Sequence, residues 1–294
     1  MTATEQKQYE SVGRMNRYAG QRVANLIEMA RTIRIDILEM CYGVGPERKA
    51  HPGGALSAVE IVTALYFDIM RINPDDPHWA ERDRFILSKG HACPVLYAAL
   101  ANRGYFDKSL YATLRRIDGK LQGHPDMRKT PGVDMTAGSL GHGLAAGAGI
   151  AASGKIDKKA FHTFVLLGDG ELQEGLVWES AMSAPRLGLD NLTAIVDINR
   201  LQSGGAVDEI LCLNPLREKW MSFGWNPIEI DGHDMGEVLN ALDLALASKG
   251  SPTVILAKTV KGKGVDYMEN DNSWHQKTPS EEQYRQAIEA LKAG

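Results

Sequence analysis

The chain has 294 residues, and its 33 lysines and arginines stand against 37 aspartates and glutamates, giving a formal net charge of −4. A hydrophobic fraction of 44% and a charged fraction of 24% are ordinary for globular proteins and exclude a mainly disordered chain. A slightly acidic chain also argues against nucleic-acid binding, which favours a basic face.

The cysteines and the first residues bear on the cellular location. Cys41, Cys93 and Cys212 are widely separated, which indicates neither a disulfide framework nor a zinc ribbon. The opening sequence MTATEQKQYE has no apolar core and no basic amphipathic pattern, and the chain has no apolar stretch of about 18 uncharged residues. We therefore expect a cytoplasmic protein that makes no membrane contact.

The chain begins with a polar stretch, residues 1–22, which we predict to be a lead-in to a single domain over residues 23–294. Apolar residues three and four positions apart predict a helix over residues 24–42. No internal repeat, low-complexity tract or linker interrupts the remainder.

The next elements surround two loops. A loop reading His-Pro-Gly-Gly covers residues 51–54, and Ser57 with Glu60 predicts a capping box that begins a second helix. A short buried strand is expected at residues 85–88, followed by a helix at 94–103.

Small residues dominate the middle of the chain. The sequence TAGSLGHGLAAGAGIAASG, residues 136–154, predicts a loop and a tightly packed helix. Apolar runs at 164–167 and 192–198 predict buried strands, and the intervening residues 171–187 have helical spacing. Together they indicate a β-α-β unit with a right-handed crossover.

The last part adds strands at residues 227–230 and 253–257, and Ser280 with Gln283 predicts the cap of a final helix. Apolar strands that alternate with amphipathic helices indicate an α/β fold, a mostly parallel sheet with helices on both faces.

Polar residues follow both strands of the β-α-β unit. The first strand ends in Gly168-Asp169-Gly170 and the second leads to Asn199. A right-handed crossover places these ends side by side, where open α/β sheets bind ligands. A carboxylate and an amide oxygen suit Mg²⁺, and a helix that begins near Glu171 would point its N-terminus at an anion.

The whole stretch GDGELQEGLVWESAMSAPRLGLDNLTAIVDINRLQ, residues 168–202, resembles the thiamine diphosphate signature, and its QEG triplet with Glu179 resembles the transketolase family. Further motifs resemble that family in order. They are KAHPGGALS (49–57), ILSKGHACPVLYAAL (86–100), GHPD (123–126), TAGSLGHGLAAGAGIA (136–151), and KTVKGKG (258–264) with Trp274-His275. The resemblance covers residues 23 to 285.

The resemblance implies the thiamine diphosphate-binding fold of the diphosphate-binding (PP) type, and transfer of a two-carbon ketol unit from a ketose to an aldose. The implied catalytic residues are His51, His124, His275 and Glu174. The implied cofactor-binding residues are His91, Gly138, Ser139, Leu140, Gly168, Asp169, Gly170, Asn199 and His275. The implied Mg²⁺ ligands are Asp169, Asn199 and the main-chain carbonyl of Leu201, with Ca²⁺ or Mn²⁺ as substitutes.

Individual roles follow from the same resemblance. His51 and His275 would contact substrate hydroxyls, and His91 and His275 would touch the diphosphate. His124 would bind the C1 hydroxyl of the donor, and Glu174 would lie between two cofactor sites. Several histidines suit this reaction because hydroxyl protons must be removed and returned near neutral pH. We interpret His78 and His162 as packed or surface residues, and His233 as part of a turn.

The sequence departs from the family at a few positions. His142 stands where Gln is usual, Ser139 replaces a frequent Pro, and Gln276 follows His275 where Gly is usual. Pro185-Arg186 is expected to interrupt a helix. These departures bear on the substrate and not on the cofactor.

The chain stops shortly after His275, whereas full-length transketolases carry two further domains. One of these supplies the glutamate that activates the aminopyrimidine of the cofactor. The resemblance therefore implies that this chain is inactive alone and forms an α₂β₂ assembly with a separate C-terminal subunit. Its substrates would be a ketose and an aldose, phosphorylated or related, with neither nucleic acid nor membrane as a partner.

Three alternatives remain open. The same cofactor module occurs in 1-deoxyxylulose-5-phosphate synthase-like and 2-oxoacid dehydrogenase-like enzymes. Gly147, Gly149 and Ala152 fit the GxGxxA pattern of a dinucleotide oxidoreductase, although no strand is predicted before them. A non-catalytic protein that kept the fold is disfavoured because the metal-site residues and four loop histidines are all present.

Overall fold

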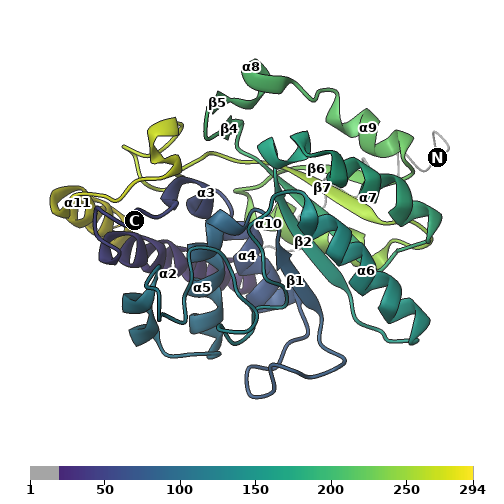
Figure 1. The fold of residues 1–294 in the computed structure, drawn as a ribbon, viewed down its shortest axis with the longest axis horizontal. Helices are drawn as coiled ribbons and strands as arrows, with labels where there is room; N and C mark the ends of the chain where they lie inside the picture. The colour runs from purple at the N-terminus through teal and green to yellow at the C-terminus, as the bar shows by residue number, and fades with distance from the viewer. Residues whose placement is uncertain (1–19, 294) are drawn as a thin grey trace.

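A five-stranded parallel sheet forms the centre of the molecule in the computed structural model, which describes residues 20–293 (Figure 1). The strand order is β1-β2-β3-β7-β6, and every neighbouring pair is parallel. The strands are β1 (Arg84–Leu87), β2 (Thr163–Gly168), β3 (Leu192–Ile198), β6 (Asn226–Asp231) and β7 (Thr253–Lys258). A small antiparallel pair, β4 (Leu201–Gln202) and β5 (Gly205–Ala206), follows β3.

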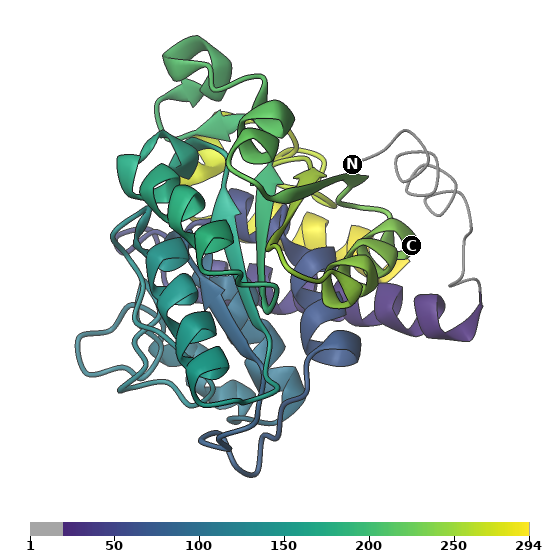
Figure 2. The same cartoon turned by 90° about the vertical axis from the view of Figure 1, so that its right-hand side faces the viewer.

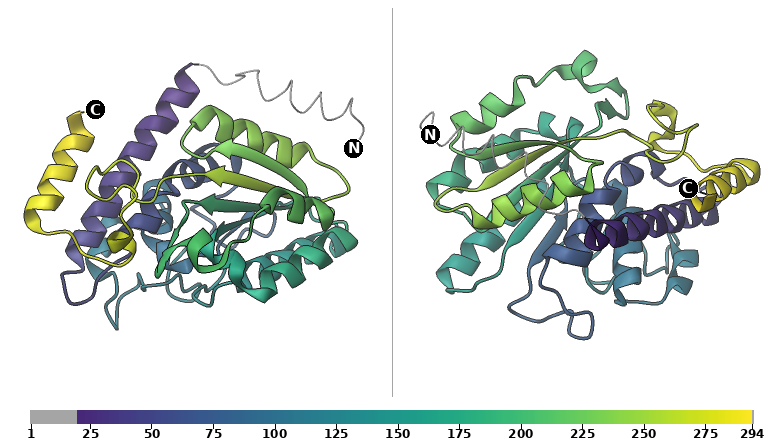
Figure 3. Two further views of the ribbon diagram at one scale, coloured as in Figure 1. Left: turned by 90° about the horizontal axis from the view of Figure 1, so that it is seen from above. Right: turned by 180° about the vertical axis from the view of Figure 1, so that it is seen from behind.

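Helices cover both faces of the sheet, as Figures 2 and 3 show. The helices are α2 (Gln21–Gly43), α3 (Pro52–Leu56), α4 (Val59–Ala64), α5 (Cys93–Arg103), α6 (His142–Ile156), α7 (Gly175–Arg186), α8 (Val207–Leu211), α9 (Leu216–Ser222), α10 (Met235–Ala247) and α11 (Glu281–Ala293). None of the helices within residues 20–293 is both long and apolar enough to cross a membrane.

Alternate residues of β2 serve two hydrophobic cores. Phe164 and Leu166 pack with α2, α4, α5 and α10, whereas Val165 and Leu167 pack with α6, α7 and α9. A strand buried on both faces needs apolar residues at every position, which explains the unbroken apolar runs in the sequence. The predicted α/β fold is confirmed.

Most predicted elements appear close to their expected bounds. β3 covers the residues predicted for it, and α2 begins at Gln21, inside the predicted lead-in, of which residues 1–19 lie outside the described part. The division into a lead-in and one domain stays a prediction. The capping box of α11 is confirmed, because Ser280 and Gln283 exchange hydrogen bonds of 3.0 and 3.2 Å.

The predicted capping box at Ser57 is wrong. The preceding His-Pro-Gly-Gly segment begins the short helix α3, with Pro52 at its first position, where a missing N–H costs nothing. The Ser57 hydroxyl donates to Asp197 (2.6 Å), and α4 begins at Val59 without a side-chain cap. Glu60 instead contacts Arg34. Contacts with residues distant in the sequence therefore determine the hydrogen bonds of both Ser57 and Glu60.

Helix α7 also differs from expectation at both ends. It begins at Gly175, after a 3₁₀ helix over Gly170–Gln173, and not near Glu171. It continues through Pro185 to Arg186, so the proline does not interrupt it before its last residue. A proline there leaves the Ala181 carbonyl without its helical donor, and the indole N–H of Trp225 donates to that oxygen (2.8 Å).

The GxGxxA residues do not form a dinucleotide-binding turn. Gly147, Gly149 and Ala152 lie inside α6, and no strand occurs within residues 114–141, all of which are described. A Cβ atom built on Gly147 would be only 2.4 Å from Val165 Cγ2 of β2. The glycine serves close packing of helix on sheet, as predicted for the small-residue segment, and the oxidoreductase alternative is excluded.

Replacing Gly147 by alanine should lower the free energy of unfolding by about 1–3 kcal/mol, because Val165 is a stiff side chain on a central strand and cannot move aside. Gly149→Ala in the same helix is the matched control. A Cβ atom there meets nothing within 4 Å, and the change should stabilise by up to about 1 kcal/mol. Urea unfolding of the two variants measures both; equal effects would contradict this packing.

Candidate active site

A buried ion pair lies at the carboxyl edge of the sheet. Lys89, two residues after β1, binds a carboxylate oxygen of Asp197 in β3, and the two side chains are 2% and 0% exposed. Ser57 donates to the same carboxylate at 2.6 Å, and Thr259 donates to its other oxygen. Burial alone would raise the pKa of Asp197, but Lys89 and the hydroxyl donors hold it below its usual value.

Three oxygen-bearing residues expected to hold Mg²⁺ line one cavity beside this pair. The cavity has a volume of about 230 Å³, and its lining includes Asp169, Asn199 and Leu201. The two Asp169 oxygens accept from the N–H groups of Gly170 (2.8 Å) and Arg200 (2.5 Å). Burial, together with repulsion from Asp197, raises the pKa of Asp169 to about 6.

The other two oxygens are oriented by hydrogen bonds. The Asn199 amide donates to Ser57 (3.2 Å), and its oxygen accepts from the N–H of Leu201 (3.1 Å). The Leu201 carbonyl accepts from the ammonium group of Lys261 (3.0 Å). A carboxylate, an amide and a carbonyl are hard oxygen donors with lone pairs to spare, and this set fits Mg²⁺.

One observation favours a bound ligand in this cavity, and another limits how a metal could be held there. Gln202 Oε1 lines it, is buried, and has no hydrogen-bond partner among the described residues. No group of three His, Cys, Asp or Glu side chains within residues 20–293 is placed to hold a metal, so a metal here depends on the mixed oxygen set. The residues present therefore fit a divalent cation and an anionic ligand.

The structure brings most of the expected cofactor residues to this cavity. Its lining includes His91, Leu140, Gly168, Asp169, Gly170, Glu174, Asn199, Leu201 and His275. Gly138 and Ser139 are exposed and do not line it; Gly138 lies instead against the ring of His124. Glu174 is exposed at the N-terminus of α7, where it makes no capping hydrogen bond.

Four histidines from separate loops gather next to the cavity. The His51 ring centroid lies 5.3 Å from that of His91, 5.5 Å from that of His275 and 6.4 Å from that of His124. The His91 and His275 centroids are 5.2 Å apart. The sequence-predicted cluster therefore exists, although His51 and His124 lie outside the cavity itself.

These imidazoles are neutral at physiological pH. Burial, with repulsion from His275, lowers the pKa of His51 to about 3. Burial, with the charges of Lys261 and Lys89, lowers the pKa of His275 to about 4. Desolvation and Arg115 lower the pKa of His124. A neutral imidazole can accept a hydroxyl proton and return it.

Several site residues escaped the sequence analysis. Glu171 is buried, and its carboxylate accepts from Ser88, from Gly141 N–H (2.9 Å) and from Gly168 N–H (3.0 Å). It thereby joins the ends of β1 and β2 to the loop before α6. For Lys89 the sequence did contain a signal. Asp197 is an acidic residue inside an apolar strand, and a buried charge needs a partner of opposite charge.

The remaining histidines lie elsewhere. His78 is exposed, and His162 is buried with its Nε2 atom 2.8 Å from Thr193 Oγ1. His142 is exposed at the start of α6, with Nδ1 3.3 Å from the Leu140 carbonyl. None of the three joins the cluster.

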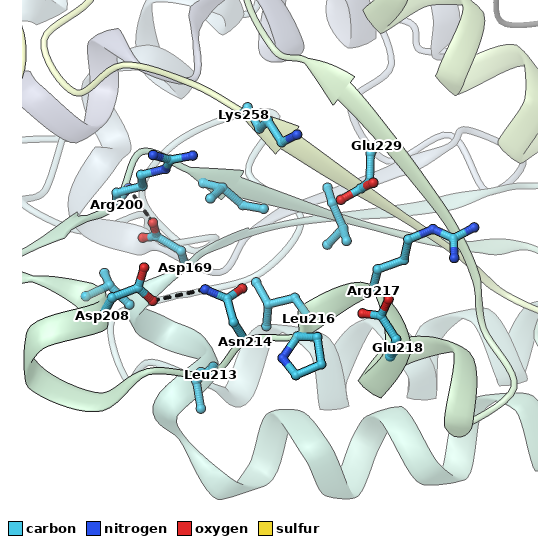
Figure 4. A pocket seen from close by; sticks show the side chains of 14 residues that line it. Asp169, Arg200, Asp208, Leu213, Asn214, Leu216, Arg217, Glu218, Glu229 and Lys258 are labelled. Atoms are coloured by element: carbon cyan, nitrogen blue, oxygen red, sulfur yellow. Dashed lines mark hydrogen bonds between the residues drawn. The ribbon is translucent and has the colours of Figure 1, made fainter.

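A larger cavity, about 460 Å³, also has Asp169 in its lining (Figure 4). Arg200, Asp208, Glu229 and Lys258 are among the residues that line it, and Asp169 is the only predicted site residue there. Arg200 connects the two cavities, because its N–H binds Asp169 while its side chain lines this second space. Volume alone does not identify the site.

Comparison with known proteins finds relatives that are named as transketolases or transketolase subunits. Residues 23–292 match the family described as "Transketolase, thiamine diphosphate binding domain". The chain is 42% identical over 241 residues to an apulose-4-phosphate transketolase subunit of Phocaeicola vulgatus, covering 82% of this chain and 85% of that one. It is 44% identical over 248 residues to a 6-deoxy-6-sulfo-D-fructose transketolase subunit of Clostridium sp., covering 84% and 90%.

Longer relatives match only in part. Human transketolase is 39% identical over 272 residues, which is 92% of this chain and 42% of the human one. The solved transketolase of Leishmania mexicana aligns with a TM-score of 0.83 at 29% identity, covering 91% of this chain and 41% of that one. The chain thus spans about two fifths of these proteins.

Stability should depend on pH through His51. Its pKa is about 3 in the folded protein and about 6.5 when unfolded, so the unfolded state binds more protons between these values. The free energy of unfolding should fall by about 2 kcal/mol from this residue alone between pH 7 and pH 5.

Urea unfolding at both pH values tests this dependence. His51→Asn should lose that share of the pH dependence. Replacing the exposed His78 is the matched control, because it deletes a histidine outside the cluster. An unchanged pH dependence in His51→Asn would contradict the neutral cluster.

Proposed function

Because the chain belongs to the transketolase family, we propose that it is the diphosphate-binding subunit of a two-subunit transketolase, which transfers a two-carbon ketol unit from a ketose to an aldose. The observation that supports this most strongly is the convergence of four neutral histidines beside a cavity lined by Asp169, Asn199 and Leu201. Thiamine diphosphate, when bound, supplies the electron sink for breaking the C2–C3 bond of the ketose.

The chain's own residues would handle protons and orientation. His51 and His124, which are neutral, would remove protons from sugar hydroxyls and return them, and His275 would donate a hydrogen bond to a sugar hydroxyl. Nδ1 of His275 lies 3.0 Å from the Lys261 ammonium, which can only donate, so Nε2 of His275 carries the ring proton and is a donor. His91 would lie toward the diphosphate.

Asp169, Asn199 and the Leu201 carbonyl would hold Mg²⁺. Asp169 resists ionisation because burial and repulsion from Asp197 raise its pKa. Its carboxylate would be stabilised in the charged form by a divalent cation, whose charge would favour the binding of an anionic diphosphate. The same oxygens would accept Ca²⁺ or Mn²⁺.

A separate C-terminal subunit would complete the site. The two relatives named as transketolase subunits have nearly the length of this chain, whereas full-length transketolases are more than twice as long. Glu174 is exposed, as an interface residue between two cofactor sites would be before an α₂β₂ assembly forms. We propose a cytoplasmic complex.

The names of the relatives suggest the substrate class. One relative acts on apulose-4-phosphate and another on 6-deoxy-6-sulfo-D-fructose, both of which carry a terminal anion. We propose that the donor here is a ketose with an anionic end, recognised largely by the partner subunit. The same names favour transketolase over the synthase-like and dehydrogenase-like alternatives.

The isolated chain should show no ketol transfer when it is supplied with thiamine diphosphate and Mg²⁺, because the group that activates the aminopyrimidine is on the partner. Co-expression with the C-terminal subunit should restore turnover, measured on a panel of ketose donors. Robust turnover by the chain alone would contradict the two-subunit proposal.

Asp169→Ala should abolish Mg²⁺-dependent binding of thiamine diphosphate in the assembled enzyme, because no carboxylate would remain to hold the cation beside the diphosphate. Asp208→Ala is the matched control, since Asp208 lines only the neighbouring cavity. Calorimetry gives both affinities. The metal assignment is wrong if Asp169→Ala binds the cofactor as tightly as the control does.

A further inference from the structure

The segment that follows β7, residues 259–262, is placed by three different elements; we call it the Lys261 loop. The N–H of Thr259 donates to the last carbonyl of β3 (3.1 Å), and that of Gly262 donates to a carbonyl of α3 (3.0 Å). Between them, the N–H of Val260 donates to the ring nitrogen Nε2 of His233 (2.8 Å). A histidine side chain thus completes the anchoring of this loop.

Both ring nitrogens of His233 are committed. Nε2 accepts from a backbone N–H, so it carries no proton, and Nδ1 therefore carries the proton and donates to Glu60 (3.0 Å). Burial alone would raise the pKa of Glu60, but His233 and Arg34 hold it below its usual value. Arg34 binds the other Glu60 oxygen at 2.5 Å and also donates to the Lys263 carbonyl (3.1 Å).

The Lys261 loop in turn holds two groups of the active site. Lys261 is 1% exposed, and its three ammonium donors have three acceptors within reach. These are the Leu201 carbonyl (3.0 Å), Nδ1 of His275 (3.0 Å) and the Asn272 side chain (3.2 Å). The carbonyl proposed for Mg²⁺ and one proposed catalytic histidine therefore share one support.

The turn that carries His233 does not itself need an imidazole. The Asp231 side chain accepts from the N–H of His233 (2.8 Å), and Gly232 N–H donates to the Lys258 carbonyl (2.8 Å). Those two contacts form the turn after β6. The ring reaches out of the turn to the buried Glu60 and to Val260, so its chemistry serves contacts outside the turn.

We propose that His233 is a positioning residue, which sets Lys261 through Val260 and thereby fixes the Leu201 carbonyl and His275. This inference rests on the proposed function, because it assigns His233 to the support of that same site. His233 touches neither the cavity nor the histidine cluster.

Two substitutions separate the acceptor from the donor of the ring. His233→Gln can place a carbonyl oxygen where Nε2 lies and keep the bond from Val260. His233→Asn keeps a donor near Nδ1 and offers Val260 no acceptor. Each variant is prepared with the partner subunit, and Mg²⁺-dependent binding of thiamine diphosphate is measured by calorimetry alongside the free energy of unfolding.

His233→Asn should weaken Mg²⁺-dependent cofactor binding about 10-fold, the lower end of what outer support residues contribute to metal sites, whereas His233→Gln should stay close to wild type. His162→Asn is the matched control, because His162 is buried at the opposite, amino-terminal edge of the sheet. It should lower stability and leave cofactor affinity unchanged.

The outcomes are distinguishable. If the wild-type assembly does not bind thiamine diphosphate, the proposed function fails. If the wild type binds but His233→Asn binds equally well, or if both His233 variants lose affinity only in step with stability, the positioning role is overturned.

A direct measurement covers the case in which His233→Asn does not fold. Nitrogen-15 NMR of the wild-type complex with isotope-labelled histidine should show that His233 is protonated at Nδ1 and unprotonated at Nε2. A proton on Nε2 would remove the contact with Val260 and overturn the inference.

Discussion

The carboxylate of Asp197 constrains the rest of the site. An uncompensated charge inside a parallel sheet costs several kcal/mol, so the fold must deliver a cation there, and Lys89 is that cation. The pair joins β1 to β3 across the end of β2, where Gly168 has no side chain and the Lys89 stem passes 3.8 Å from the missing Cβ position. Ser57 and Thr259 donate further hydrogen bonds to the Asp197 carboxylate, which brings α3 and the end of β7 to the carboxyl edge of the sheet. The metal-site oxygens and the Lys261 loop follow within a few residues of these contacts.

Burial is the main reason why the histidines are neutral, and the same concentration of positive charge adds to it. Beyond burial, Lys261 and Lys89 lower the pKa of His275, and Arg115 lowers the pKa values of His51 and His124. Two requirements of the proposed chemistry therefore share one contributing cause. Fixed cations suit an anionic cofactor, and they help to keep the imidazoles beside them uncharged at neutral pH. Burial alone would favour neutral histidines but would leave an anion without a partner.

The sequence predicted what depends on local pattern. The apolar run of β3 and the reciprocal cap of α11 need only neighbouring residues, and both appear as expected. Ser57 had the same capping pattern, yet its hydroxyl binds Asp197, 140 positions away. The site divides in the same way: family-like motifs brought Asp169, Asn199 and four histidines to one place. Lys89, Glu171 and Lys261 act through contacts separated by 108, 83 and 60 positions, which no local spacing reveals.

Four of the five tryptophans fall into two separate environments. Trp220 lies 5.4 Å from Trp178 and 4.9 Å from Trp225, measured between ring centroids, and this cluster lies where α9 meets α7. Trp274 is buried next to His275, with the Lys277 ammonium 4.4 Å from its ring centre. Its carbonyl lies 2.9 Å from where a Cβ on Gly53 would stand, beside the loop that carries His51. The chain thus contains one native fluorophore next to His275 and a second set where α9 meets α7, so substituting the other tryptophans would leave Trp274 as an optical reporter beside the proposed cofactor site.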